Sequence, residues 1–211
     1  MPDLMILSLR VPRESENTPE ASAQLLASLG KATKNPDFIT KLLGSEPIFI
    51  SLELTVIKGQ VSFNIVFPKH LRTFIESQVL ATYPNALITE TKDYLTNWSL
   101  TTGHFQLIKQ QYASYYPLRD YADYKEVDPM LPILGVLSKA GEEDQILVQF
   151  VMAPPTKKVF QSAKSYLHPK PKLDSEGHTV KEVQPEGKKL IEDKLSQPLL
   201  SVSVRFLANR P

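Results

Sequence analysis

The sequence predicts an α+β protein with mainly antiparallel sheets and helices packed on one face of each sheet. Short runs of alternating hydrophobic residues recur along the chain, segments with helical spacing separate them, and one tight hairpin joins two of the runs. The 211 residues suffice for one large or two small domains, and a hydrophobic fraction of 42% suffices for a core.

The first half of the chain alternates between strand and helix patterns. Thr18 and Pro19 suit the start of a helix, as cap and first residue, and Lys58-Gly59 suits a tight turn between two strands. We expect strands over residues 5–11, 48–57, 61–67 and 86–94, and helices over residues 18–30 and 69–82. The resulting order, β-α-β-β-α-β, is that of a ferredoxin-like (split βαβ) unit, which we expect over residues 1–95.

The register of the hairpin follows from the alternation of its first strand. One row holds Ile48, Ile50, Leu52 and Leu54, so this row is expected to lie beneath both helices. Glu53 belongs to the opposite row. We expect that row to face solvent, where replacement of Glu53 should cost little stability.

The second half repeats the plan with one strand fewer. Strands are expected over residues 98–110, 145–153 and 199–207, helices over residues 128–139, 156–167 and 187–196, and a polar, mobile loop over residues 168–187. The sequence thus predicts two ferredoxin-like units in tandem. The second, residues 98–211, is incomplete and carries a helix–loop insertion at about 156–187.

Composition and motifs exclude several classes of enzyme. The chain has no Cys, which excludes disulfide scaffolds, thiol catalysis and Cys-ligated metal sites. It holds only 8 Gly, and neither a P-loop nor a G-x-G-x-x-G motif occurs. The four His show no metal-ligand spacing, and no Ser lies in a nucleophile-elbow motif. We therefore expect no catalytic, cofactor-binding or metal-binding residues, and a protein that is not an enzyme. A small enzyme on a ferredoxin-like scaffold is an alternative, because fold alone does not determine function.

The segment 112–124 has an unusual composition, with five Tyr in 13 positions. One interpretation is a stacking platform for single-stranded nucleic acid, with Tyr112, Tyr115 and Tyr116 offering ring faces and Arg119 a phosphate contact. The other is a long connection whose rings pack over the edge of a sheet.

A lysine-rich segment follows at residues 157–189, with eight Lys against four acidic residues, a local net charge of +4. Lys157, Lys158 and Lys164 would contact phosphate groups or an acidic membrane surface. The alternative is a solubilising face beside a flexible loop. Over the whole chain 24 basic residues balance 23 acidic ones, so bulk charge alone would not hold the protein to nucleic acid.

No membrane span is expected. The longest hydrophobic runs, Pro47–Leu54 and Ile146–Ala153, have strand length, far below the ~20 residues of a spanning helix. The first residues, MPDLMILSLRVPRE, lack the basic region and the long hydrophobic core of a signal peptide. We expect a cytoplasmic protein.

Several segments carry a resemblance to a known family. They are residues 117–124 (PLRDYADY), 128–139 (DPMLPILGVLSK), 9–16 (LRVPRESE), 67–78 (FPKHLRTFIESQ) with 83–86 (YPNA), 145–150 (QILVQF) and 191–198 (IEDKLSQP). Over essentially all its length the chain resembles the amino-terminal accessory domain, a domain of unknown function, of HerA/FtsK-like type IV secretion or conjugative-transfer ATPases of candidate-phylum bacteria.

The resemblance implies a role without catalysis. In that family a P-loop motor follows this region, whereas the present sequence has no position that matches the Walker residues. It therefore implies a non-catalytic accessory domain of a DNA translocase that mediates assembly or partner docking. The implied partners are its own or a separate motor domain, further copies in a ring, and DNA; the full-length protein would lie at the inner face of the membrane. A stand-alone nucleic-acid-binding module, using the tyrosine and lysine segments, is the alternative.

Overall fold

The computed structural model describes residues 3–12, 18–33, 48–98, 104–109, 111–119, 121–124, 128, 130–169 and 187–209. The chain divides into two compact units. The sheet unit comprises Met1–Ile108, Tyr121–Pro154 and Leu200–Pro211, and the helical unit comprises Lys109–Asp120 and Pro155–Leu199.

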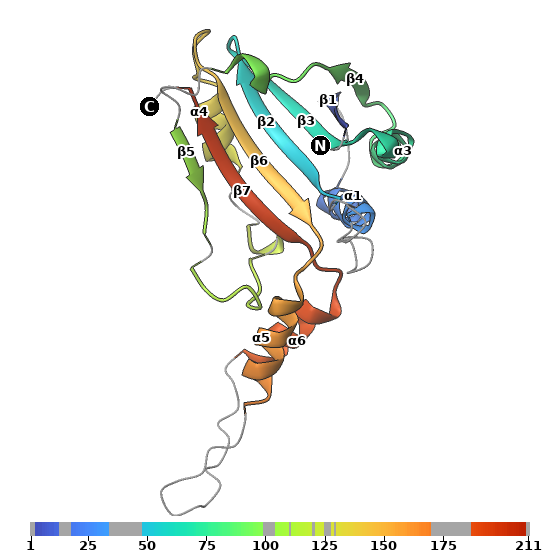
Figure 1. Cartoon of the computed structure of the whole chain (residues 1–211), viewed down its shortest axis with the longest axis vertical. Helices are drawn as coiled ribbons and strands as arrows, with labels where there is room; N and C mark the ends of the chain where they lie inside the picture. The colour runs from blue at the N-terminus through green and yellow to red at the C-terminus, as the bar shows by residue number, and fades with distance from the viewer. Residues whose placement is uncertain are drawn as a thin grey trace, which may run out of the picture. The chain divides into compact units, whose positions relative to one another are not determined.

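Among the described residues, seven antiparallel strands form one sheet in the sheet unit (Figure 1). The strands are β1 (Leu4–Arg10), β2 (Ile50–Ile57), β3 (Gln60–Pro68), β4 (Leu87–Thr91), β5 (His104–Leu107), β6 (Ile146–Ala153) and β7 (Ser201–Ala208). Their spatial order is β4-β1-β3-β2-β6-β7-β5. The predicted α+β class with an antiparallel sheet is confirmed.

The tandem arrangement of two ferredoxin-like units is not confirmed. β2 pairs with β6 from Ile50↔Met152 to Val56↔Ile146, so strands from both halves of the sequence share one sheet. The physical reason is that β2 would otherwise be an edge strand, and its unpaired backbone groups are satisfied by β6.

Three helices belong to the sheet unit and two to the helical unit, within the described ranges. They are α1 (Pro19–Ala32), α3 (Arg72–Thr82) and α4 (Leu131–Leu137) in the sheet unit, and α5 (Lys157–Leu167) and α6 (Lys188–Ser196) in the helical unit. Short 3-10 turns occur at Lys69–Leu71, Leu95–Asn97 and Tyr121–Tyr124. Most of the expected loop, residues 170–186, lies outside the described residues.

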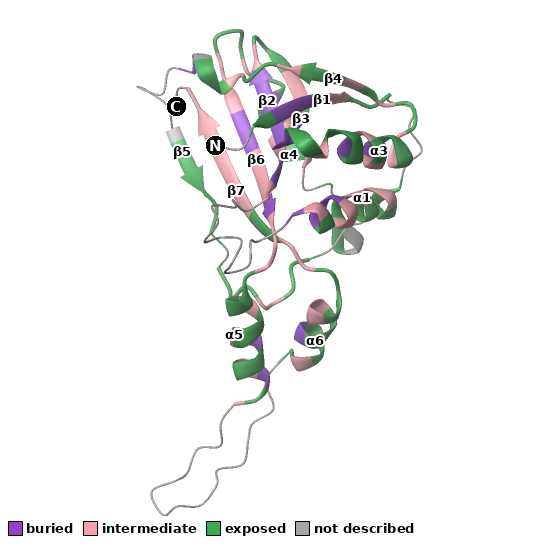
Figure 2. Cartoon of the chain, turned by 45° about the vertical axis from the view of Figure 1, so that its right-hand side comes forward, coloured by how far each residue is buried: buried purple, intermediate pink, exposed green. Residues whose placement is uncertain are grey.

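The predicted hydrophobic row of the hairpin lies beneath the helices. Ile50 packs with Leu29 of α1 and Ile75 of α3, and all three side chains are completely buried. Further along the same row, Leu54 packs with Leu137 of α4. Figure 2 shows these buried positions along the central strands and on the inner sides of the helices. The helix layer is incomplete, since Phe63 on this face is 52% exposed.

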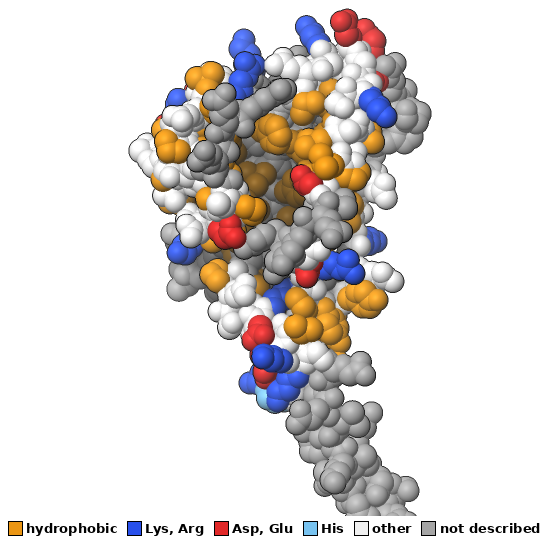
Figure 3. Space-filling model, turned by 180° about the vertical axis from the view of Figure 1, so that it is seen from behind, with side chains coloured by type: hydrophobic (Ala, Val, Ile, Leu, Met, Phe, Trp, Pro, Cys, Tyr) orange, Lys and Arg blue, Asp and Glu red, His pale blue; other side chains and the backbone are white. Residues whose placement is uncertain are grey.

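Seen from behind, the molecule shows hydrophobic side chains gathered around a hollow (Figure 3).

None of the helices within the described ranges is both long enough and hydrophobic enough to cross a membrane.

Candidate functional site

The face of the sheet opposite the helices carries a row of polar side chains. Cross-strand neighbours place one polar residue on each of six adjacent strands. The row runs Thr89, Ser8, Asn64, Glu53, Gln149 and Arg205, from β4 across to β7. Because side chains alternate along each strand, this polar row is the direct counterpart of the hydrophobic core row on the other face.

Glu53 lies at the centre of this row and is only 5% exposed. Its Oε1 accepts a hydrogen bond from Gln149 Nε2 at 2.8 Å, and its Oε2 accepts a hydrogen bond from the Tyr94 hydroxyl. The expectation that Glu53 faces solvent is therefore wrong. The chain segment after β4 brings Tyr94 over the sheet, and this covering chain, together with the neighbouring strands, buries the carboxylate.

The Tyr94 hydroxyl stays protonated at neutral pH. Burial raises its pKa well above the ordinary value, and the negative charges of Glu53 and Asp93 raise it further. A neutral Tyr94 acts as a donor to Glu53, so it does not serve as a base at neutral pH. Next to it, Asn64 Nδ2 donates to Thr55 Oγ1 at 2.9 Å, which extends the buried polar network along the sheet.

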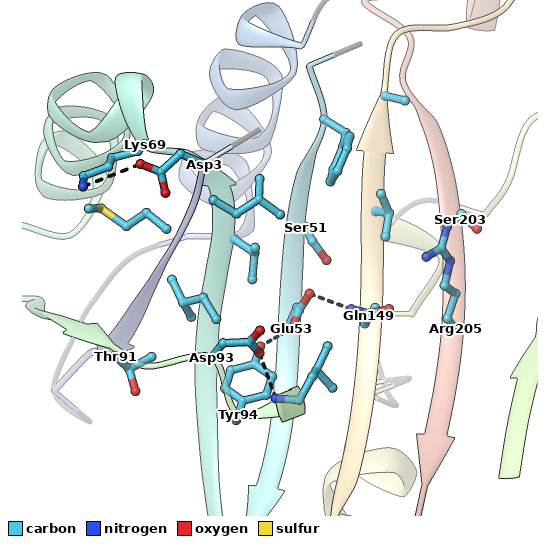
Figure 4. Close-up of a pocket in the computed structure, with 18 of the residues that line it drawn as sticks. Asp3, Ser51, Glu53, Lys69, Thr91, Asp93, Tyr94, Gln149, Ser203 and Arg205 are labelled. Carbon is cyan, nitrogen blue, oxygen red and sulfur yellow. Dashed lines mark hydrogen bonds and ion pairs between the residues drawn. The ribbon is translucent and has the colours of Figure 1, made fainter. Parts of the chain in front are cut away.

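An open cleft of about 670 Å³ lies over this polar row. Its floor combines polar groups, among them Ser51, Glu53 and Gln149, with hydrophobic side chains such as Val66 and Val151. Figure 4 shows the labelled side chains of β2, β6 and β7 on the same side of the sheet, with Tyr94 next to Glu53. A volume of this size is typical of sites for small molecules.

Ser51 and Arg205, which line the cleft, lack partners for their side chains among the described residues. Ser51 is 3% exposed, and its buried Oγ has no hydrogen-bond partner among the described residues. Arg205 is half-buried, and no hydrogen bond or ion pair joins its guanidinium to any part of the chain that the structure describes. Because buried polar groups are normally satisfied, the buried Ser51 hydroxyl needs a partner that the described residues do not supply, such as a water molecule or a ligand.

The first part of the tyrosine segment, with Tyr112, Tyr115 and Tyr116, belongs to the helical unit, where these rings contact one another, whereas Tyr121 and Tyr124 belong to the sheet unit. Tyr115 stacks on Tyr166 of α5 with centroids 5.2 Å apart, and the Tyr116 and Tyr166 hydroxyls lie 2.9 Å apart. Lys194 Nζ donates to the carbonyl oxygens of Ser114 and Tyr116, each at 2.7 Å, and burial lowers its pKa. The rings thus contribute to the small core around Ala163, Leu167 and Ile191.

The other residues singled out from the sequence remain on the surface of the same unit. Tyr112 is 70% exposed, and Arg119 is exposed as well. Lys157, Lys158 and Lys164 are exposed on α5, whose buried residues are Ala163 and Leu167. All seven residues expected to contact nucleic acid or a partner therefore lie in the helical unit.

The cleft residues were not singled out from the sequence. Glu53, Tyr94, Gln149 and Arg205 come from four segments, and only the strand pairing brings them together. In the sequence, the signal for this polar face was the presence of Ser51, Glu53 and Thr55 at alternate positions of the expected strand 48–57.

No cluster of three or more potential metal ligands occurs among the residues that the structure describes. Comparison of the chain with protein-family models, with curated proteins and with solved structures finds no match. The functional interpretation therefore depends on the geometry described above and on the resemblance in sequence.

Proposed function

We propose that the chain is a non-catalytic accessory domain of a DNA-translocating or type IV secretion-type ATPase, which mediates assembly of the motor or docking of a partner. The association with such an ATPase depends on the sequence resemblance. The observation that supports a binding role is the sheet face opposite the described helices, which carries a cleft lined by polar groups from three neighbouring strands.

The strand order is compatible with the finer fold proposal. β4-β1-β3-β2, with α1 and α3 on one face, is the order of a ferredoxin-like unit. The strands β6-β7-β5 with α4 would then be the incomplete second unit, joined to the first through the β2–β6 pair. Fusion of two such units into one sheet would give an accessory domain an extended face for a partner.

The test is sedimentation velocity of the 211-residue chain alone and mixed with a purified motor domain of the family it resembles. We expect co-sedimentation with the motor and no ATP hydrolysis by the chain alone. A matched pair of variants locates the contact: Ser203→Glu on the cleft face should weaken it, and Ser138→Glu, exposed at the end of α4, should not. Failure of the chain to bind the motor would contradict the proposal.

Nucleic-acid binding by the helical unit is the second candidate. The observation in its favour is that the exposed Lys157, Lys158 and Lys164 lie in the same unit as the exposed Tyr112 and Arg119. The packing of Tyr115 and Tyr116 on Tyr166 reduces the ring surface left for stacking on bases.

Fluorescence anisotropy of a labelled single-stranded oligonucleotide tests this candidate. Replacing all three lysines by Glu should weaken binding and lower the salt dependence, by a slope of about 0.7 for each phosphate that is no longer neutralised. In the matched control, three lysines that are exposed in the sheet unit, Lys58, Lys92 and Lys139, are replaced by Glu, so that the net charge changes by the same amount. Equal weakening in both triple variants would show a nonspecific charge effect and would exclude the helical unit as the site.

A further inference from the structure

The charged groups that line the cleft do not all balance one another. Asp3 pairs with Lys69 at 3.7 Å, and Glu90 pairs with Arg72 at 2.9 Å. Three charged lining residues are left without an ionic partner in the described part of the chain: Glu53, Asp93 and Arg205. Glu53 accepts hydrogen bonds only from neutral groups, so its charge is solvated by dipoles but not neutralised.

These three groups form two poles of opposite charge. Glu53 and Asp93 both lie beside Tyr94 at the negative pole. Arg205 lies two strands away on β7, with Gln149 of β6 between it and Glu53. Two strand spacings amount to roughly 10 Å between the backbones. Figure 4 shows both poles on the same side of the sheet.

Ser51 supplies an independent sign of a missing ligand. It lies two residues before Glu53 on β2, on the same face, and its hydroxyl has no partner among the described residues although the residue is only 3% exposed. An unpaired buried hydroxyl is costly, and a ligand that reaches Glu53 would pass next to it.

Next to the poles, along the strands, the cleft has a hydrophobic wall. Val66 and Val151 flank Ser51 on the neighbouring strands, and Phe49 and Ala153 line the cleft beyond them. A hydrocarbon chain would be sheltered there, whereas a ligand of high charge density would leave this wall in contact with water.

We propose that the cleft binds a small zwitterionic molecule, with its ammonium group at Glu53, its carboxylate at Arg205 and its hydrocarbon part against Val151 of the intervening strand β6. The ammonium group neutralises the buried carboxylate and brings a donor within reach of the Ser51 hydroxyl. The planar guanidinium of Arg205 matches a carboxylate through two parallel hydrogen bonds. This inference does not depend on an association with a motor.

Isothermal titration calorimetry on the full 211-residue chain tests the proposal with a series of ω-amino acids of increasing chain length. Each is compared with the alkylamine and the alkanoate of the same length. At least one ω-amino acid should bind about tenfold or more tightly than either truncated compound, as expected when one charge-assisted hydrogen bond is removed. If no member of the series binds more tightly than both of its truncated forms, the proposal is overturned.

Variants separate the two poles. Glu53→Gln should lower the affinity for the zwitterion and for the amine and leave the affinity for the alkanoate unchanged. Arg205→Gln should lower the affinity for the zwitterion and for the alkanoate and leave the affinity for the amine unchanged. The matched controls Glu142→Gln and Arg10→Gln, both exposed and outside the cleft, should change nothing. Circular dichroism melts check the fold of each variant.

Ser51→Ala keeps the proposal testable if Glu53→Gln fails to fold. This substitution should lower the affinity for the zwitterion and for the amine without any decrease in thermal stability. If it leaves both affinities unchanged, or if the Glu53 and Arg205 variants weaken all ligands alike, the two-pole assignment is wrong.

Discussion

The two faces of β2 are both buried, but they are buried by different chemistry. Ile50, Leu54 and Val56 point beneath the helices and are at most 5% exposed. On the opposite face, Ser51, Glu53 and Thr55 are also at most 5% exposed, although all three are polar. One face excludes water with hydrophobic packing, and the other holds a hydrogen-bonded polar network.

The comparison shows that alternation of polarity along a strand does not identify its solvent-exposed face. On the helix-covered face the main favourable contribution is hydrophobic burial, at about 25 cal/mol per Å². On the cleft face each polar group needs a partner, because burial of an unsatisfied one costs about 1–3 kcal/mol. Substitutions should therefore fail for different reasons on the two faces, and the following predictions test this difference.

The largest effect is expected for Leu54→Asp on the helix-covered face. It would bury a carboxylate among Leu137 and Val148 without a partner, at a cost of several kcal/mol that approaches the whole stability of a domain. Urea denaturation followed by circular dichroism should show an unfolded sheet unit. The control Leu87→Asp, at a side chain that is 57% exposed, should stay folded. If both variants behaved alike, the register of β2 described here would be refuted.

A smaller decrease is expected for Glu53→Leu on the cleft face. The substitution adds hydrophobic surface, yet it removes the acceptor for Tyr94 and Gln149 and should lower the free energy of unfolding by about 1–3 kcal/mol. The same urea experiment measures it. An unchanged or higher stability would show that the network makes no net contribution and that this face resembles an ordinary solvent-exposed face.

The contrast between the faces also marks what the sequence could and could not predict. Hydrophobic periodicity predicted the core row of β2, and it predicted the bounds of most described strands and helices to within about three residues, because local spacing determines both. The strand expected over residues 98–110 is an exception, since only β5, His104–Leu107, is described there. Periodicity did not predict the β2–β6 pair, since the choice of partner for an edge strand depends on residues almost 100 positions apart. The burial of Glu53 was missed for the same reason. The covering Tyr94 is 41 residues away, and a polar row looks the same in sequence whether it faces water or a cleft.

An effect of about 1 kcal/mol is expected for Tyr94→Phe, which removes one hydrogen bond to Glu53. This effect should depend on pH. Because the pKa of Tyr94 in the folded protein is raised above its ordinary 10.0, the folded state holds the proton more tightly than the unfolded state. The stabilisation is therefore complete below pH 10 and declines as the pH rises above it. The difference in unfolding free energy between wild type and Tyr94→Phe should shrink from about pH 9 to about pH 11. A difference that grows over this range would contradict the raised pKa.

The smallest effect, with the opposite sign, is expected for Ser51→Ala. Ser51 shares the cleft face with Glu53, but its hydroxyl has no partner among the described residues and so adds a desolvation cost without a hydrogen bond. Its removal should leave the stability unchanged or raise it by up to about 1 kcal/mol, whereas removal of a satisfied hydroxyl at this depth would lower the stability by a similar amount. Thermal unfolding of Ser51→Ala beside Ser62→Ala, on the same face of β3 and without such burial, measures the difference. A clear destabilisation would mean that the Ser51 hydroxyl is satisfied in solution, and that the cleft face is complete without a ligand.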